Sequence, residues 1–223
     1  MTNRAKFLKS IRHRTRAGQY KPTKAPDVAW TSTGAPQEHE PIEDPPSRFL
    51  EELKALGGHG ERIESYEQAG EYVLSLAKER ETELLVRWDV EDLERLEVDG
   101  SLEEAGVELV VWRELEDFRE VAAKADIGLT TAEWAIAETG SLVIEGGPAK
   151  GRSVTLLPPV HIAVVPVDRV LSTVPEAIAK YAEGGGVPAN LTFHTGPSKS
   201  GDIEMTLAVG VHGPGEVHVV LVG

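Results

Sequence analysis

Short, almost uninterrupted runs of Val, Ile and Leu, separated by helix-like segments, most constrain the fold of this chain. The clearest run covers residues 160–165, and shorter ones cover residues 84–86, 127–130 and 217–222. Strands that are apolar on both faces are typical of a parallel sheet with helices packed against each side. The sequence therefore predicts an α/β fold, with a mainly parallel sheet sandwiched by helices.

The segments between these runs have the spacing and end signals of helices. Ser65 with Gln68 forms a capping box before an apolar face of helical period, and Pro175 stands at a favoured first helical position. Ser47 is the expected cap of the first helix. We predict helices over residues 47–56, 66–78, 101–105, 115–123, 175–181 and 202–209, strands over 107–112, 141–144 and 191–194, and a turn or short helix over 131–140.

The N-terminal region differs from the rest of the chain in composition. Residues 3–16 carry a short apolar face among basic residues, which is too short for a stable isolated helix. Six prolines within residues 22–46 indicate an extended linker. We therefore place a domain boundary near Ser47, with residues 1–46 as an extended arm and linker and residues 47–223 as one α/β domain.

The chain contains no cysteine, which limits its chemistry. Disulfides and thiolate nucleophiles are excluded, and so is any iron–sulfur cluster held by cysteines of this chain. No apolar run approaches the roughly 18 residues needed to span a bilayer. The basic N-terminus is not followed by the apolar segment of a secretory signal, so we expect a cytoplasmic protein.

Charge is unevenly distributed along the chain. Residues 1–24 hold eight of the 23 Lys and Arg residues and no acid, so the remaining 15 basic residues face all 37 acidic ones. A body this acidic is not expected to bind nucleic acid. The basic arm suits docking on an acidic partner or on a second copy of the chain. A solvated arm fits the same charges.

The most informative candidate site follows the predicted strand 191–194. Its residues are Thr195, Gly196, Pro197, Ser198, Lys199, Ser200, Gly201 and Asp202. Glycines let a backbone approach a ligand, and a helix that begins near Asp202 would point free N–H groups into the loop. We expect this loop at the carboxyl end of a parallel strand, where ligands usually bind. It predicts a phosphate or carboxylate site, although a turn capped by Ser200 or Asp202 fits the same residues.

A second candidate site lies between two predicted strands. Its expected ligand-binding residues are Thr131, Glu133, Thr139, Gly140 and Ser141. Glu138 here, and Glu204 beyond the first loop, are the candidate catalytic residues, because a desolvated carboxylate can act as a base or nucleophile. We expect both to line one crevice, within reach of His212 and Gly213. A capped turn with solvated acids is the alternative.

Histidines are sparse and widely separated in the sequence. His161 lies in an apolar strand, where a core role is commoner than metal binding, and His194 and His212 fall at loop edges. Together with His218 they show no ligand spacing such as HExxH. The sequence therefore predicts no metal site.

Several blocks resemble the lactate-utilisation protein C family, which carries the LUD domain. The matching blocks are residues 125–130, 137–141, 156–161, 195–198, 202–204, 210–214 and 218–222. The Thr-Gly-Pro-Ser block and the His-Gly-Pro block are specific in combination, and the resemblance covers residues 47–223. Lys199 stands where Arg is commoner, and Lys lacks the planar fork that binds an anion through two bonds.

The resemblance implies a fold related to the NagB, RpiA and CoA-transferase group. It also implies a non-redox subunit that serves the oxidation of L-lactate to pyruvate, together with partner proteins that carry the iron–sulfur clusters. The residues leave two other roles open. One is a free-standing enzyme that acts on a phosphorylated or CoA-linked small molecule through a catalytic Glu, and the other is a regulatory module that binds a ligand without turnover.

Overall fold

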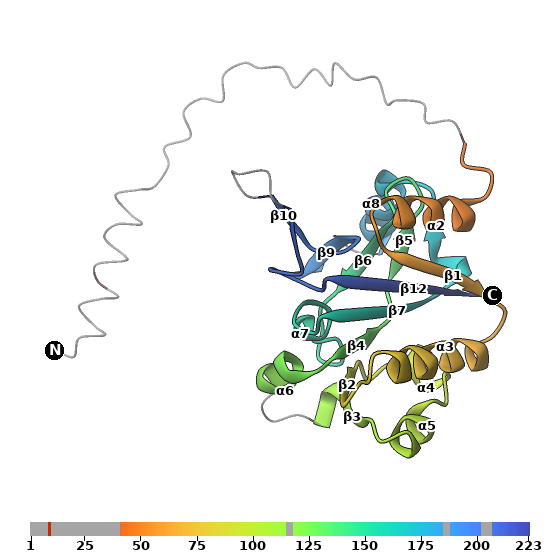
Figure 1. The fold of residues 1–223 in the computed structure, drawn as a ribbon. Helices are drawn as coiled ribbons and strands as arrows, with labels where there is room; N and C mark the ends of the chain where they lie inside the picture. Colours follow the sequence, from red (N-terminus) through yellow and green to blue (C-terminus); the bar gives the residue numbers. More distant parts are fainter. Residues whose placement is uncertain (1–8, 10–40, 115–117, 185–187, 202–206) are drawn as a thin grey trace. The chain divides into compact units, whose positions relative to one another are not determined.

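The computed structural model describes residue 9 and residues 41–114, 118–184, 188–201 and 207–223. All helices and strands discussed below lie within the unit Pro41–Gly223 (Figure 1). The predicted basic arm, apart from Lys9, and most of the linker lie outside the described residues. So do Asp202 and Glu204.

Six parallel strands form the main sheet, in the order β1-β12-β7-β4-β2-β3. The strands are β1 (His59–Ile63), β12 (Glu216–Val222), β7 (Val160–Pro166), β4 (Ile127–Thr130), β2 (Leu84–Arg87) and β3 (Glu108–Val111). The prediction of a mainly parallel sheet is confirmed. The sequence did not predict β1, because this edge strand is polar and buries only Ile63.

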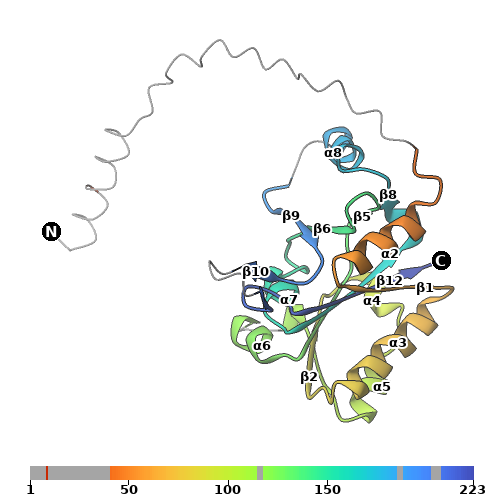
Figure 2. The same cartoon turned by 45° about the horizontal axis from the view of Figure 1, so that its top comes forward.

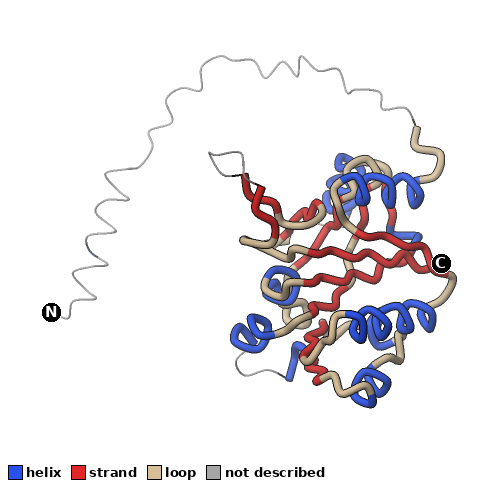
Figure 3. The backbone as a smooth tube through the Cα atoms, in the orientation of Figure 1, coloured by secondary structure: helices blue, strands red, loops and turns tan. Residues whose placement is uncertain are grey.

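Both faces of this sheet are covered, as Figures 2 and 3 show. All four residues of β4 are buried, as are six of the seven in β7. Helices α3 and α5 pack on one face, and α2, α6 and α7 lie on the other. Gly128 lets α7 pack closely on β4, since a Cβ there would lie 2.0 Å from the Val154 carbonyl oxygen of α7.

Three of the described helices, α2, α3 and α8, begin at a side-chain cap. The described helices are α2 (Pro45–Ala55), α3 (Tyr66–Glu79), α4 (Glu91–Glu94), α5 (Asp99–Glu104), α6 (Phe118–Lys124), α7 (Arg152–Leu156) and α8 (Val174–Glu183), with 3₁₀ turns at Trp112–Glu114 and Val167–Arg169. Ser65 accepts from the Gln68 N–H at the start of α3, as predicted. The expected cap Ser47 is wrong, because Asp44 is the residue that caps α2. Among the described residues, no helix is long and apolar enough to cross a lipid bilayer.

A second sheet of four strands lies beside the first. Its order is β8-β5-β6-β9, formed by β8 (Val170–Leu171), β5 (Trp134–Ile136), β6 (Ser141–Glu145) and β9 (Leu191–Thr195). Strands β5 and β6 form an antiparallel hairpin, and β9 pairs antiparallel with β6. The predicted turn or short helix over residues 131–140 is therefore wrong at Trp134–Ile136, which form β5, and right over residues 137–140, which form a turn. A strand of three residues is too short to show a period in the sequence.

A two-stranded hairpin, β10 (Lys199–Gly201) with β11 (Leu207–Val209), extends from this part of the molecule. The predicted helix over residues 202–209 is wrong at Leu207–Val209, where the backbone pairs with β10 instead. Lys199 lies opposite Val209 in this ladder. Within the described residues, no helix N-terminus therefore faces the 195–201 loop.

Candidate functional site

A cavity of about 850 Å³ opens at the carboxyl end of the parallel sheet. It lies where β1, β7 and β12 end, beside Glu64, Pro166 and Val222. The N-terminus of α3 and the short helix α4 complete its wall. In open parallel sheets this edge is where ligands usually bind, because loops and helix N-termini converge there.

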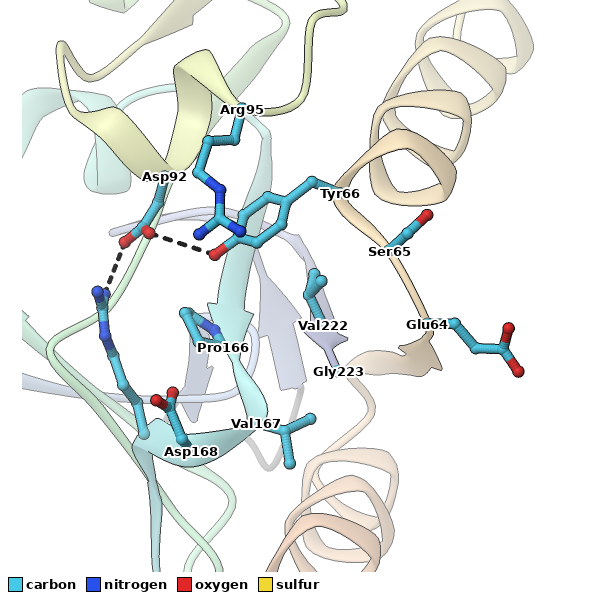
Figure 4. Close-up of a pocket in the computed structure, with 11 residues that line it drawn as sticks. Glu64, Ser65, Tyr66, Asp92, Arg95, Pro166, Val167, Asp168, Val222 and Gly223 are labelled. Carbon is cyan, nitrogen blue, oxygen red and sulfur yellow. Dashed lines mark hydrogen bonds and ion pairs between the residues drawn. The ribbon is translucent and has the colours of Figure 1, made fainter.

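Asp92 contacts two other polar side chains that line this cavity (Figure 4). Its Oδ1 accepts a hydrogen bond from the Tyr66 hydroxyl at 3.2 Å, and its Oδ2 lies 2.7 Å from Nη1 of Arg169. Burial, followed by the Asp92 charge, raises the pKa of Tyr66. The hydroxyl therefore stays protonated and acts as a donor at neutral pH. These contacts join α3, α4 and the turn after β7 around one cavity.

Arg95 provides a positive charge that no described carboxylate neutralises through an ion pair. Its guanidinium carbon lies 3.7 Å from the centroid of the Tyr66 ring, a cation–π stack that fixes the side chain at the cavity wall. The stack leaves the edge of the guanidinium fork available to a carboxylate or phosphate. Figure 4 shows Arg95 directed across Tyr66, whereas Glu64 points away from both.

The first turn of α3 adds backbone donors to the same wall. The Ser65 side chain satisfies only the Gln68 N–H, and the N–H groups at the start of a helix have no intrahelical acceptor. They favour negative charge through the helix dipole. Arg169 and the Tyr66 hydroxyl are already engaged by Asp92, and Glu64 and Asp168 add negative charge to the lining. Arg95 and the helix N-terminus are therefore the groups that suit a small anion.

The loop at residues 195–201 lies elsewhere. The Ser198 N–H donates to the Pro214 carbonyl at 2.9 Å, and the Lys199 ammonium donates to the Leu56 carbonyl at the end of α2. Leu56 precedes β1 and Pro214 precedes β12, so the loop lies beside the amino ends of the parallel strands. The expectation that it lies at their carboxyl ends is wrong, because β9 belongs to the second, mixed sheet, where it pairs antiparallel with β6. Anion binding by this loop stays a prediction.

The structure does bring several predicted site residues together at this amino end. Hydroxyl groups form a short row in which Thr139 donates to Ser141 at 2.8 Å, and Ser141 and Thr195 share a hydrogen bond of 2.8 Å. Gly213 packs against Ser198, since a Cβ on Gly213 would lie 3.4 Å from the Ser198 Cβ. The Thr-Gly-Pro-Ser and His-Gly-Pro blocks are thus neighbours. Gly196 and Pro197 lie between these contacts, and His212 is exposed.

The predicted acids are not part of that row. Glu138 accepts from the Val174 N–H at 2.7 Å, so its carboxylate caps the N-terminus of α8. Glu133 forms an ion pair with Lys150. Thr131 is buried, and its hydroxyl has no hydrogen-bond partner among the described residues. Because Glu204 lies outside those residues, a crevice shared by Glu138 and Glu204 stays a prediction.

Sequence reasoning missed the residues of the carboxyl-end cavity. Tyr66, Asp92, Arg95 and Arg169 come from segments that follow three different strands, and no local motif joins them. One signal was available, since each follows a predicted strand or opens a predicted helix. Because the polar edge strand β1 was not predicted, the sequence did not show that Tyr66 follows a strand of the same sheet.

Comparisons with known proteins agree on one family. The family model of the LUD domain matches residues 47–222. The protein named lactate utilization protein C from Halalkalibacterium halodurans is 38% identical over 157 residues, which cover 69% of this chain and 67% of that protein. Its namesake from Exiguobacterium sp. is 44% identical over 108 residues, and that from Bacillus subtilis 41% over 105. These two alignments span about half of each relative, 47% and 44%.

A solved structure shares the fold. The crystal structure of a DUF162 family protein from Deinococcus radiodurans superimposes with a TM-score of 0.57 at 22% identity, and the match covers 82% of this chain and all of that one. At this identity the likeness concerns the fold alone. It agrees with the helix-covered parallel sheet described above.

Proposed function

This chain belongs to the LUD domain family, and we propose that it serves lactate utilisation as a non-redox subunit that binds a small carboxylate. Relatives that are 38–44% identical carry the name lactate utilization protein C, which supports the pathway. The carboxyl-end cavity supports the ligand class. L-lactate and pyruvate each carry one carboxylate and one further oxygen, a pattern that a guanidinium and neighbouring donors can match.

The proposal assigns electron transfer to partner proteins. Oxidation of L-lactate to pyruvate removes two electrons and two protons, which an acceptor must take. A chain without cysteine cannot hold a cysteine-ligated iron–sulfur cluster. We therefore expect the clusters on iron–sulfur partners, with this subunit positioning or sensing the carboxylate.

The observation that carries the proposal is Arg95. Its guanidinium is stacked on Tyr66, forms no ion pair with the described residues and borders a cavity of about 850 Å³. Asp92 is already engaged by Tyr66 and Arg169, so its charge is partly neutralised. By contrast, the carboxylate of Glu138 caps a helix, which gives no support to its role as a catalytic residue.

Calorimetry tests the ligand. We expect L-lactate or pyruvate to bind the full chain and Arg95→Ala to weaken that binding roughly 10-fold or more, because a charged hydrogen bond is worth about 1.5–3 kcal/mol. Arg95→Lys should fall between the two, since it keeps the charge but not the fork. Arg48→Ala is the matched control, because Arg48 pairs with Glu52 on α2 outside the cavity. If Arg95→Ala binds every carboxylate as tightly as the unchanged chain, the cavity is not the site.

A further inference from the structure

Two histidines and a glutamate meet at the amino ends of β1 and β12, far from the cavity at the carboxyl ends. His59 and His218 are register partners on these adjacent strands, and their rings stack with centroids 4.6 Å apart. Glu216 precedes His218 by two residues and therefore projects from the same face of the sheet. One ligand atom from each of the three lies within 4.8 Å of the others.

We propose that His59, Glu216 and His218 bind one divalent transition-metal ion of the zinc class. Two imidazoles and a carboxylate are a ligand set that such ions accept, and imidazole in particular suits zinc, cobalt, nickel and copper. Around a tetrahedral ion with bonds of about 2.1 Å, ligand atoms lie roughly 3.4 Å apart. The Nε2 of His218 and Oε1 of Glu216 lie 2.7 Å apart and must therefore open by about 0.7 Å, whereas His59 must move toward them from within 4.8 Å. His59 is exposed, so its ring can make that adjustment without disturbing the core.

The surrounding hydrogen bonds already orient the ligands. The Tyr72 hydroxyl lies 2.7 Å from Nδ1 of His218, and Nε2 of the same ring lies 2.7 Å from Oε1 of Glu216. With a metal ion on Nε2, the Nδ1–H group donates to Tyr72. A second partner that fixes the ring in this way is a regular feature of metal-binding histidines.

Arg80 holds the carboxylate. It contacts both oxygens of Glu216, with Nε 3.2 Å from Oε2 and Nη2 2.5 Å from Oε1. A metal ion would take Oε1 and leave Oε2 on Arg80, so the carboxylate stays anchored after binding. Glu216 is thus supported by Arg80, as His218 is supported by Tyr72.

The site has room for a ligand that the protein does not supply. A cavity of about 250 Å³ is lined by His59, Tyr72, Arg80 and His218. Three protein ligands with one open position are the pattern of zinc sites that hold a water or a substrate. The expectation of no metal site rested on linear spacing, which does not reveal that His59 and His218 are neighbours across 159 positions of sequence.

The competing explanation is a structural network in which Arg80, Glu216, His218 and Tyr72 only tie α3 to the sheet. Metal binding distinguishes the two. The tag-free, full-length chain is stripped with a chelator and titrated with Zn²⁺ against a chromophoric competitor, and then with Co²⁺ while its visible absorption is recorded. We expect one equivalent of either ion to bind, with the intense Co²⁺ bands of a tetrahedral site.

Substitutions at the proposed ligands and their neighbours test where the ion binds. His59→Ala should weaken Zn²⁺ binding roughly 100-fold or more and Tyr72→Phe roughly 10-fold, since loss of a supporting contact typically costs 10–100-fold. His59 is exposed, so His59→Ala should fold normally. His212→Ala is the control, because His212 is exposed and outside the cluster. Failure of the unchanged chain to bind Zn²⁺ at millimolar concentration, or equal binding by His59→Ala, overturns the proposal. Neither result depends on lactate, so the proposed function is tested separately.

Discussion

His161 is the residue whose burial has the clearest consequence for stability. It is 1% exposed, its Nε2 is 2.8 Å from the Thr130 hydroxyl, and its Nδ1 has no hydrogen-bond partner among the described residues. Burial, with smaller contributions from His194 and His218, lowers the pKa of His161 to about 3. The neutral ring fits this site, whereas the unfolded chain takes up a proton below its ordinary pKa of 6.5.

The direction of the pH effect follows from this difference. The contribution of His161 is complete above pH 6.5 and is lost as the pH falls from 6.5 toward about 3. One extra proton on the unfolded state lowers the free energy of unfolding by up to about 1.4 kcal/mol per pH unit. Urea unfolding between pH 8 and pH 5 measures this slope, and His161→Gln should flatten it. An unchanged slope in His161→Gln, relative to an exposed control His212→Gln, would show that the ring titrates normally in the folded state.

Lys199 has two possible roles, one in stabilising the end of α2 and the other in binding an anion. Its ammonium donates to the Leu56 carbonyl at the end of α2, where a cation is stabilised by the helix dipole. We expect Lys199→Gln to lower the free energy of unfolding by up to about 1 kcal/mol, and to weaken anion binding as well only if the 195–201 loop holds the anion. Thermal unfolding and calorimetry with L-lactate and phosphate check both parts. A tenfold loss of anion affinity would instead support an anion site in the 195–201 loop.

At the scale of elements, the turn between β5 and β6 is fixed by its contact with α2. Gly140 has φ +61°, and a Cβ there would lie 2.6 Å from the Leu53 backbone nitrogen. Gly140→Ala should therefore destabilise the fold by about 2 kcal/mol or more, through backbone strain and displacement of α2. Chemical unfolding measures the change.

Gly100 provides the matched control for that prediction. It lies in α5, and a Cβ there meets nothing within 4 Å. Gly100→Ala should stabilise the protein by about 0.5–1 kcal/mol, because Ala costs less backbone entropy in a helix. Similar effects of the two substitutions would contradict the close packing of the β5–β6 turn on α2.

The predictability of each element followed from its burial. Strands β4 and β7 are buried on both faces, so their apolar runs identified them in the sequence. Strand β1 is a polar edge strand, and β5 has three residues, so neither gave a usable period. The position of the 195–201 loop depended on which sheet contains β9. That choice is made by tertiary pairing with β6, which no local pattern records.

The candidate site was harder to predict than the fold for a related reason. Tyr66 opens α3 and Arg95 follows the end of α4, yet their side chains stack, and Arg169 reaches Asp92 from the turn after β7. These are contacts between distant segments. Thr139, Ser141 and Thr195 were each predicted to bind a ligand, and that stays a prediction. Their hydrogen-bonded row was not predicted, because it joins two segments that are distant in the sequence. Its location at the amino ends of the parallel strands was not predicted either.

At the scale of the whole molecule, charge separates the arm from the rest of the chain. Residues 1–24 contain eight basic residues and no acid, and the rest holds 37 acids against 15 bases. We expect the arm to help attach this subunit to acidic surfaces of iron–sulfur partners or of a second copy. Electrostatic attraction of this kind weakens with salt, because the screening length is about 8 Å at physiological ionic strength.

Deletion of residues 1–24 tests this expectation. Association of the full and shortened chains with themselves is measured by sedimentation, and association with iron–sulfur partners by co-purification, each at low and at high salt. The full chain should associate more strongly at low salt and lose that advantage at high salt. A chain of full length whose eight arm Lys and Arg residues are changed to Gln separates charge from length and should behave like the deletion. If the shortened chain assembles as well as the full one at both salt concentrations, the arm has no part in assembly, and the partnership rests on the family alone.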